Sequence, residues 1–195
     1  MACLTRLTDT LAKKLRQLWA DRGAVAAVEL ALAMPMLVLL FLGSAEMANL
    51  LSVHYRAAQM ASTVTDAVAR YQSITGADIA SLFAASSHVM GSDDFAQKGY
   101  VILSSVTTAA AKNTAKVSWQ CSGGGSRSRA SGLGEVGETV SLPGGLTIDA
   151  NDNVVVAEVY YQYVPVFDML PIGEEIYKTA VFRPRLGALT SAAGC

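Results

Sequence analysis

The longest apolar run in the chain constrains most strongly what the chain can fold into. Residues Ala24 to Leu42 read AVAAVELALAMPMLVLLFL, with one charged residue, Glu29, and one proline, Pro35. Extended through residues 43–45, the run is 22 residues long. As a helix it spans roughly 33 Å, which is enough to cross a hydrocarbon core of about 30 Å. We therefore predict a transmembrane helix at residues 24–45.

Two other interpretations of this run remain open. A helix buried in the core of a soluble protein is one, but such helices seldom reach this length without a polar face. A cleaved secretory signal peptide is the other, but its apolar region usually has about 7–15 residues and ends in a small-x-small site. The run in this chain is longer and continues further, which favours a membrane anchor.

The uneven distribution of charge predicts the direction of the anchor. Residues 1–23 carry five basic and two acidic side chains, and the first basic residue after the apolar run is Arg56. Because the cytoplasmic flanks of membrane helices carry an excess of Lys and Arg, we expect a cytoplasmic leader at residues 1–23 and an external domain at residues 46–195. The formal net charge of −1 argues against a nucleic-acid-binding protein.

A helical pattern continues beyond the predicted span. Apolar residues recur every three or four positions, and neither proline nor glycine occurs in residues 44–75. The sequence thus predicts one helix from about Val25 to about Ile74, the first half in lipid and the second half in water. Its soluble half needs a partner that covers an apolar stripe, which consists of Val53, Ala57, Met60, Val64, Ala67, Val68 and Tyr71.

The rest of the chain predicts a short helix and a small sheet. We expect Gly76 to break the long helix and Asp78 to cap a second one from Ile79 to about Val89. The predicted fold class is α+β, with the long N-terminal helix packed on a small antiparallel sheet. Strands are expected at residues 100–103, 115–121, 153–166 and 176–183, and a flexible loop at residues 122–137.

The three cysteines fall on both sides of the predicted membrane. Cys3 belongs to the cytoplasmic side, where thiols stay reduced, whereas Cys121 and Cys195 belong to the external side, where a disulfide persists. Two unrelated free thiols are the alternative, but a pair in an oxidising compartment favours a Cys121–Cys195 bridge. It would close a loop of about 75 residues and stabilise the fold by about 4 kcal/mol in the chain-entropy account.

No catalytic constellation emerges from the sequence. The two histidines, His54 and His88, are accompanied by neither an HExxH motif nor a CxxC pair. We therefore expect no enzymatic activity, no metal and no cofactor. Residues 123–125 are explained more simply as a linker than as a phosphate site. Asp93–Asp94, and Asp149 with Asp152, are explained more simply as solvated turns than as cation sites. Residues 183–185 are explained more simply as a strand end than as a headgroup site.

Glu29 is the exception, because a carboxylate inside a membrane helix costs free energy. Insertion scales assign about 2–3 kcal/mol to an aspartate at mid-span. Glu29 lies near the cytoplasmic end of the run, so one interpretation is a side chain that reaches the membrane interface. The other is a buried acid that awaits a positive partner, which is the default inference for an ionisable group inside the membrane.

The segment around Glu29 also resembles a known family. Arg22-Gly23 followed by AVAAVELALAMPMLVLLFLGSAEM is similar to the N-terminal motif of TadE-like minor pilins, or pseudopilins, of the tight-adherence (Tad/Flp) pilus system. The close match covers residues 22–50, and residues 154–167 and 182–185 are similar to the family's C-terminal region. The matching positions are Val28-Glu29-Leu30 for the family's VEF element, and Pro35, Gly43 and Glu46 for its proline, glycine and acidic residue.

The resemblance implies a pilin-like fold, processing and assembly. A prepilin peptidase would remove the leader at the cytoplasmic face, and Glu29 would pair with the freed amine of a neighbouring subunit. Both groups are costly when unpaired at low dielectric. Cleavage after Gly23 makes Glu29 the sixth mature residue instead of the fifth that the family pattern requires. Cleavage after Ala24 restores the spacing but places alanine where glycine is expected, and an uncleaved anchor is the third alternative.

With this resemblance the sequence predicts a structural protein of the bacterial inner membrane. It would be a minor pilin or pilus-assembly subunit, N-terminus cytoplasmic and C-terminus periplasmic, that acts in pilus biogenesis, adhesion and surface attachment and can enter an extracellular pilus. Its expected partners are the membrane, other pilin and pseudopilin subunits, the Tad assembly machinery and a prepilin peptidase, with no nucleic acid. A single-pass receptor or adaptor with an external ligand-binding domain is the alternative hypothesis.

Overall fold

A computed structural model describes the chain over residues 13–14, 16–17, 22–108, 114–167 and 173–195. The chain divides into two compact units, Met1–Met47 and Ala48–Cys195. Cys3 and most of the predicted leader lie outside the described residues. The predicted boundaries after residues 23 and 45 stay predictions.

The long helix α2 spans Arg22–Val68 and has 47 residues. The predicted end at Ile74 is wrong, because the Ala69 carbonyl accepts a hydrogen bond from the backbone N–H of Arg185 at 2.8 Å. Continued helix would need that carbonyl for residue 73. The N–H groups of Arg70 and Tyr71 bond carbonyls three residues back, which tightens the last turn. A distant segment thus ends the helix.

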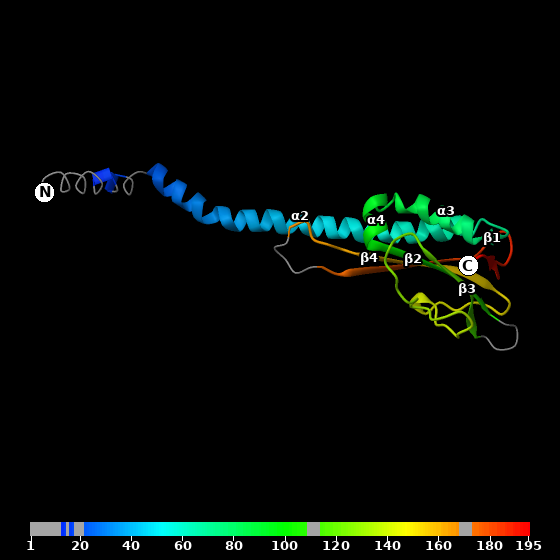
Figure 1. Cartoon of the computed structure of the whole chain (residues 1–195). Helices are drawn as coiled ribbons and strands as arrows, with labels where there is room; N and C mark the ends of the chain where they lie inside the picture. Colours follow the sequence, from blue (N-terminus) through cyan, green and yellow to red (C-terminus); the bar gives the residue numbers. More distant parts are fainter. Residues whose placement is uncertain (1–12, 15, 18–21, 109–113, 168–172) are drawn as a thin grey trace. The chain divides into compact units, whose positions relative to one another are not determined.

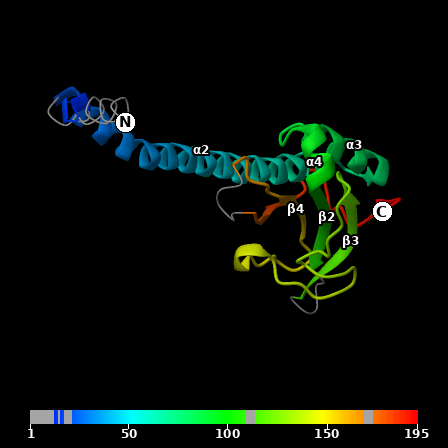
Figure 2. The same cartoon turned by 60° about the vertical axis from the view of Figure 1, so that its left-hand side comes forward.

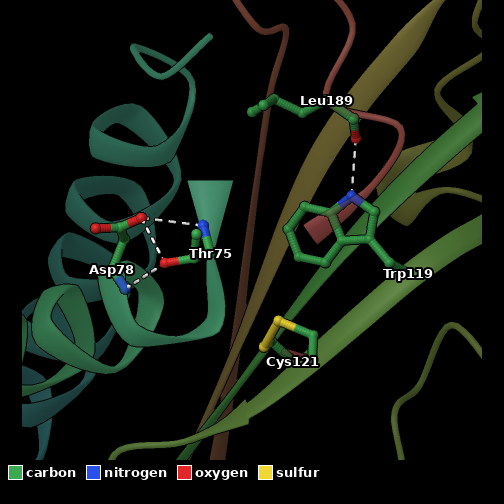
Figure 3. The surroundings of a disulfide bond; sticks show 6 residues. Thr75, Asp78, Trp119, Cys121 and Leu189 are labelled. Carbon is green, nitrogen blue, oxygen red and sulfur yellow. Dashed lines mark hydrogen bonds between the residues drawn. A yellow bond between two sulfur atoms is a disulfide. The ribbon is translucent and has the colours of Figure 1, made fainter. Parts of the chain in front are cut away.

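The connection after α2 contains a short strand whose last residue caps the next helix. Strand β1, Ile74–Thr75, pairs in parallel with β6, Ala192–Ala193. Helix α3 spans Gly76–Ser87, so Gly76 begins the second helix and does not break the first, which has already ended at Val68. The N-cap is Thr75 and not Asp78, because the Thr75 hydroxyl accepts a hydrogen bond from Asp78 N at 3.3 Å (Figure 3).

Asp78 completes this cap from the third helical position. Its carboxylate accepts hydrogen bonds from the Thr75 hydroxyl at 2.7 Å and from the Thr75 backbone N–H at 3.0 Å. Such a reciprocal pair is a capping box. The two hydrogen bonds, the one from the hydroxyl first, hold the pKa of Asp78 below its usual value. The helix packs inward through Ile79 and Phe83, which are buried, and through Leu82, which packs against the same core.

Four strands form one antiparallel sheet in the order β3-β2-β4-β5. The four predicted strands are all present, which confirms the α+β class, although the first two are longer and the third is shorter than predicted. No pattern in the sequence predicts the short helix α4, Ser92–Lys98, which precedes the sheet. The strands are β2 Gly99–Thr108, β3 Ala115–Gly123, β4 Asn153–Gln162 and β5 Glu175–Phe182.

One face of the sheet packs on helices and the other lies under loops. On β4, Val155 and Val159 belong to a core shared with α2, α3 and α4. Val154 and Val156 belong to a second core with Leu133 from the connection between β3 and β4. The alternation follows from the two-residue period of a strand. Figures 1 and 2 both show α3 and α4 on one side of the sheet and the β3–β4 connection on the other.

The second half of α2 buries the predicted apolar stripe against this sheet. Val53 and Tyr71 pack at the edge of the same core, and Ala67 is half-buried. The sheet therefore supplies the cover that the stripe requires. The centre of the stripe is fully removed from solvent, with 0% exposure at Ala57, Met60, Val64 and Val68.

The predicted flexible loop at residues 122–137 is not a free linker. Its first two residues belong to β3, and Leu133 is buried in the second core. A Cβ at Gly125 would lie 2.1 Å from the carbonyl oxygen of Gly99, so this close crossing of two backbones requires glycine. A further short 3-10 turn, η1 at Pro143–Gly145, lies in the same connection.

The C-terminal segment is bound to the sheet by side chains and by a disulfide. The predicted Cys121–Cys195 bridge is confirmed, with the Cα atoms 5.1 Å apart (Figure 3). Upstream of it, the Leu189 carbonyl accepts a hydrogen bond from Trp119 Nε1 at 2.8 Å, and Leu189 N donates to Asn153 Oδ1 at 2.9 Å. The end of the chain is therefore bound to β3 and β4, which are distant from it in sequence.

Removing the disulfide should lower the stability of the folded unit. The bridge joins residues 74 positions apart, and a loop of this length corresponds to about 4 kcal/mol in the chain-entropy account. We expect C121A/C195A to lower the free energy of unfolding by about that amount, measured by denaturant unfolding of the detergent-solubilised full chain. C3A is the matched control, and an unchanged unfolding midpoint for C121A/C195A would contradict the prediction.

Candidate functional site

The first half of α2, up to Met47, exposes apolar side chains around its circumference. The exposed large residues range from 48% for Val38 to 75% for Leu32. The most apolar window of the helix has a mean hydropathy of 2.5, and none of that window is buried within the chain. This helix is long and apolar enough to cross a membrane, and no other helix in the described part of the chain is.

Glu29 lies on this apolar surface and is itself exposed. Its neighbours Val28 and Leu30 are 59% and 56% exposed. Among the residues that the structure describes, none forms an ion pair or hydrogen bond with the Glu29 carboxylate. A carboxylate in such surroundings is costly in lipid unless it reaches water or a cation. Within the described residues, the Glu29 carboxylate thus has no partner.

The backbone of the apolar helix carries two further features. Pro35 lies inside α2 and has no N–H to donate, so the carbonyl four residues earlier loses its helical partner. Gly43 has open space around it, because a Cβ built there would meet no atom within 4 Å. No packing against the described residues therefore explains the glycine, whereas small residues let two membrane helices approach closely.

The two predicted processing residues lie in the first turn of the helix. α2 begins at Arg22, so Gly23 and Ala24 both have helical backbone. Gly23 is exposed, and glycine lowers local helix stability by about 1 kcal/mol relative to alanine. Cleavage at this point stays a prediction.

Comparison with known proteins gives one match. Residues 24–70 match the family model of TadE-like protein. Over its long helix, the chain is similar to the TadE-like proteins. The match covers about a quarter of the chain and runs from the apolar segment through the stripe that packs on the sheet. It confirms the family recognised at residues 22–50 of the sequence. No curated protein and no solved structure matches the chain.

Several of the ionisable residues singled out in the sequence make contacts within the folded unit. His54 Nε2 lies 2.9 Å from Glu174 Oε1, and His88 is exposed. Asp152 lies 2.7 Å from the guanidinium of Arg183, with Asp149 at 3.7 Å from the same group. The part of the chain that is described holds no group of three His, Cys, Asp or Glu able to bind a metal ion.

Two other polar segments singled out in the sequence also bond within the chain. Asp93 and Asp94 lie in the first turn of α4 and not in a solvated turn, which corrects the expectation for them. Asp94 forms an ion pair with Lys98 at 2.7 Å and accepts a hydrogen bond from the Tyr161 hydroxyl. Arg185 binds Asp66 on α2, so the arginines after β5 join the C-terminal segment to the rest of the fold.

Glu158 is a buried carboxylate that sequence reasoning missed. It lies on β4, on the face away from the helices, with 0% exposure. It accepts hydrogen bonds from Gly132 N at 2.8 Å, Tyr177 Oη at 2.6 Å, Tyr160 Oη at 3.2 Å and the Ser131 hydroxyl. Four donors from three segments satisfy a charge that would otherwise be costly to bury. Glu158 therefore holds the β3–β4 connection on the sheet.

The tyrosines around Glu158 are suited to remain donors. Burial, with the neighbouring Glu158 charge as the second cause, raises the pKa of Tyr160 to about 12. Burial and then the hydrogen bond to Glu158 raise the pKa of Tyr177 as well. Both phenols therefore stay protonated over the whole physiological range. The only sequence signal for this cluster is a glutamate in the middle of a strand rich in valine and tyrosine.

Removing one donor tests how far Glu158 stabilises the fold. We expect Tyr177→Phe to lower the free energy of unfolding by about 1.5–3 kcal/mol, the range for a hydrogen bond to a charged group. Tyr55→Phe, at a residue that is 77% exposed, is the matched control and should change it by less than about 0.5 kcal/mol. Equal effects of the two substitutions in chemical denaturation would show that Glu158 does not depend on this donor.

Proposed function

We propose that this TadE-like protein is a membrane-anchored minor pilin or pilus-assembly subunit of a Tad-type pilus. TadE-like family membership suggests a component of Tad pilus biogenesis. The observation that carries the proposal further is Glu29, a carboxylate exposed on an otherwise apolar helix and without a partner in the described chain. A neighbouring subunit that presents a cation at this depth would satisfy it.

The proposed orientation places the leader in the cytoplasm and the folded unit in the periplasm. The excess of basic residues before the apolar helix supports this direction. The Cys121–Cys195 disulfide supports it independently, because disulfides persist in oxidising compartments. In this arrangement the apolar helix packs with the helices of other subunits, and the sheet unit initiates, caps or adapts the filament.

The protein is proposed to be structural and not an enzyme. In the folded unit, His54, Asp94 and Asp152 are held in ion pairs, which disfavours their use in general acid or base chemistry. A receptor or adaptor with an external ligand site is the second hypothesis. It predicts that the chain does not assemble with other pilin subunits.

Substitution of Glu29 tests the assembly role. We expect Glu29→Ala and Glu29→Gln to keep the chain in the membrane fraction but to lower piliation roughly tenfold or more, as loss of about 1.4 kcal/mol of subunit pairing would. Glu29→Asp should retain part of the function because it keeps the charge. Filament counts and carbonate extraction of membranes measure the two effects.

The control for this experiment is an exposed acid on the folded unit, Glu135→Ala. It removes one negative charge without touching the helix. Wild-type piliation in both Glu29→Ala and Glu135→Ala would remove the role proposed for Glu29. Loss of Glu29→Ala from the membrane fraction would instead mean that the carboxylate serves insertion.

Processing is tested by the N-terminus of the protein isolated from its host membrane. We expect a mature chain that starts at Ala24 or Val25, because a freed amine near Glu29 is needed for the pairing. Intact-mass measurement distinguishes the two cuts, with Cys121→Ala as a control variant that should be processed alike. A chain that still begins at Met1 would show that the leader is retained.

A further inference from the structure

The loop end of the β4–β5 hairpin lies beside the turns of α2 that follow the apolar segment. Asn49 Nδ2 on α2 donates a hydrogen bond to Tyr163 Oη at 3.2 Å, directly after β4. Five residues further along α2, His54 Nε2 lies 2.9 Å from Glu174 Oε1, directly before β5. These two contacts fix this end of the hairpin to residues 49–54 within the folded unit.

The connection to the apolar helix limits how far this end is from the membrane. The predicted span ends at residue 45, so Asn49 follows it by about 6 Å and His54 by about 14 Å of helical rise. Even a fully extended chain would separate Asn49 from residue 45 by only about 14 Å. The headgroup and interfacial regions add roughly 5–8 Å on each side of the hydrocarbon core. The hairpin end therefore lies at or just outside the headgroups if the helix spans the membrane.

Large exposed apolar side chains gather at this end of the folded unit. Leu51 and Tyr55 on α2 are 53% and 77% exposed, and Val164 and Val166 after β4 are 54% and 68% exposed. Lys178 of β5 lines a shallow cavity of about 370 Å³ together with α2 residues that include Leu51 and Tyr55. We call Leu51, Tyr55, Val164, Val166 and Lys178 the juxtamembrane collar.

The charges around the collar fit a lipid surface. Lys178 and the exposed Arg56 are cations. The two acids that precede Lys178 on the hairpin are already paired, Glu174 with His54 and Glu175 with Arg129. Aliphatic and aromatic side chains with basic residues beside them are the composition found where proteins meet phospholipid headgroups. Anionic headgroups add attraction of about 1 kcal/mol per basic residue near the surface.

We propose that the juxtamembrane collar contacts the headgroup region of the membrane that holds the apolar helix. The proposal rests on the membrane anchoring proposed above. It gives the folded unit a second contact with the lipid surface besides the helix itself. The hairpin would then set the orientation of the sheet unit toward the membrane before assembly.

Tryptophan fluorescence of the full chain in proteoliposomes tests this contact. The vesicles contain phosphatidylcholine and phosphatidylglycerol, with acyl chains that are either brominated close to the headgroup or unbrominated. All variants are made in a parent protein that carries Trp19→Phe, so that the buried Trp119 is the background emission. We expect the emission added by Val166→Trp to fall roughly twofold or more in brominated vesicles, because the side chain lies at the interface. Leu186→Trp, at a residue 61% exposed elsewhere on the unit, is the matched control and should not be quenched.

Phe41→Trp, within the predicted span, separates the failure of this inference from the failure of the anchor. If Phe41→Trp is quenched and Val166→Trp is quenched no more than Leu186→Trp, the anchor stands and the collar contact is overturned. If Phe41→Trp is not quenched, the anchor fails and the collar contact with it. A blue shift of Val166→Trp without quenching by bromine would assign the collar to a protein partner, which also overturns the proposal. Thermal unfolding midpoints equal to that of the parent verify that each variant is folded.

Discussion

The apolar surface of α2 is the constraint on which the rest of the structure depends. Burying a valine or methionine fully is worth about 1.5–3 kcal/mol, so the stripe around Met60 and Val64 requires a cover. One face of the antiparallel sheet provides it. The same helix continues toward its N-terminus with apolar side chains that nothing in the folded unit can cover, because they lie all around it. One helix therefore requires two different surroundings.

The C-terminal segment turns this helix and sheet into a closed unit. The backbone N–H of Arg185 donates a hydrogen bond to the carbonyl of Ala69 and thereby ends α2. Beyond that end, β6 pairs with β1. A Cβ at Gly76 would lie 2.5 Å from the carbonyl oxygen of Gly194, so the last residues pass very close to the start of α3. The disulfide to Cys121 then joins the terminus to β3. Every one of these contacts is long-range in sequence.

The difference between local patterns and long-range contacts explains which features could be predicted from the sequence. Patterns with a local period predicted the apolar helix, its stripe and the four strands, because burial on one face imposes that period on the sequence. The pairing of Cys121 with Cys195 could also be predicted. The end of α2 could not, since Arg185 determines it, and β2 was underestimated because Ser104 and Ser105 are buried polar residues whose partners, such as the Leu189 carbonyl, come from elsewhere. The hydrogen bonds of Glu158 were missed for the same reason, because their donors Gly132 and Tyr177 come from distant segments.

Two glutamates show how the chain divides its interactions between fold and function. Glu158 is fully buried, yet four donors of the same chain satisfy its carboxylate, so its charge is used to hold a loop on the sheet. Glu29 is exposed on an apolar surface where the described chain offers it no donor or cation. A carboxylate in low dielectric is costly until it is paired. The described residues give Glu29 no such pairing, and the neighbouring subunit proposed above would supply it. Packing of apolar helices alone would not fix a register in this way.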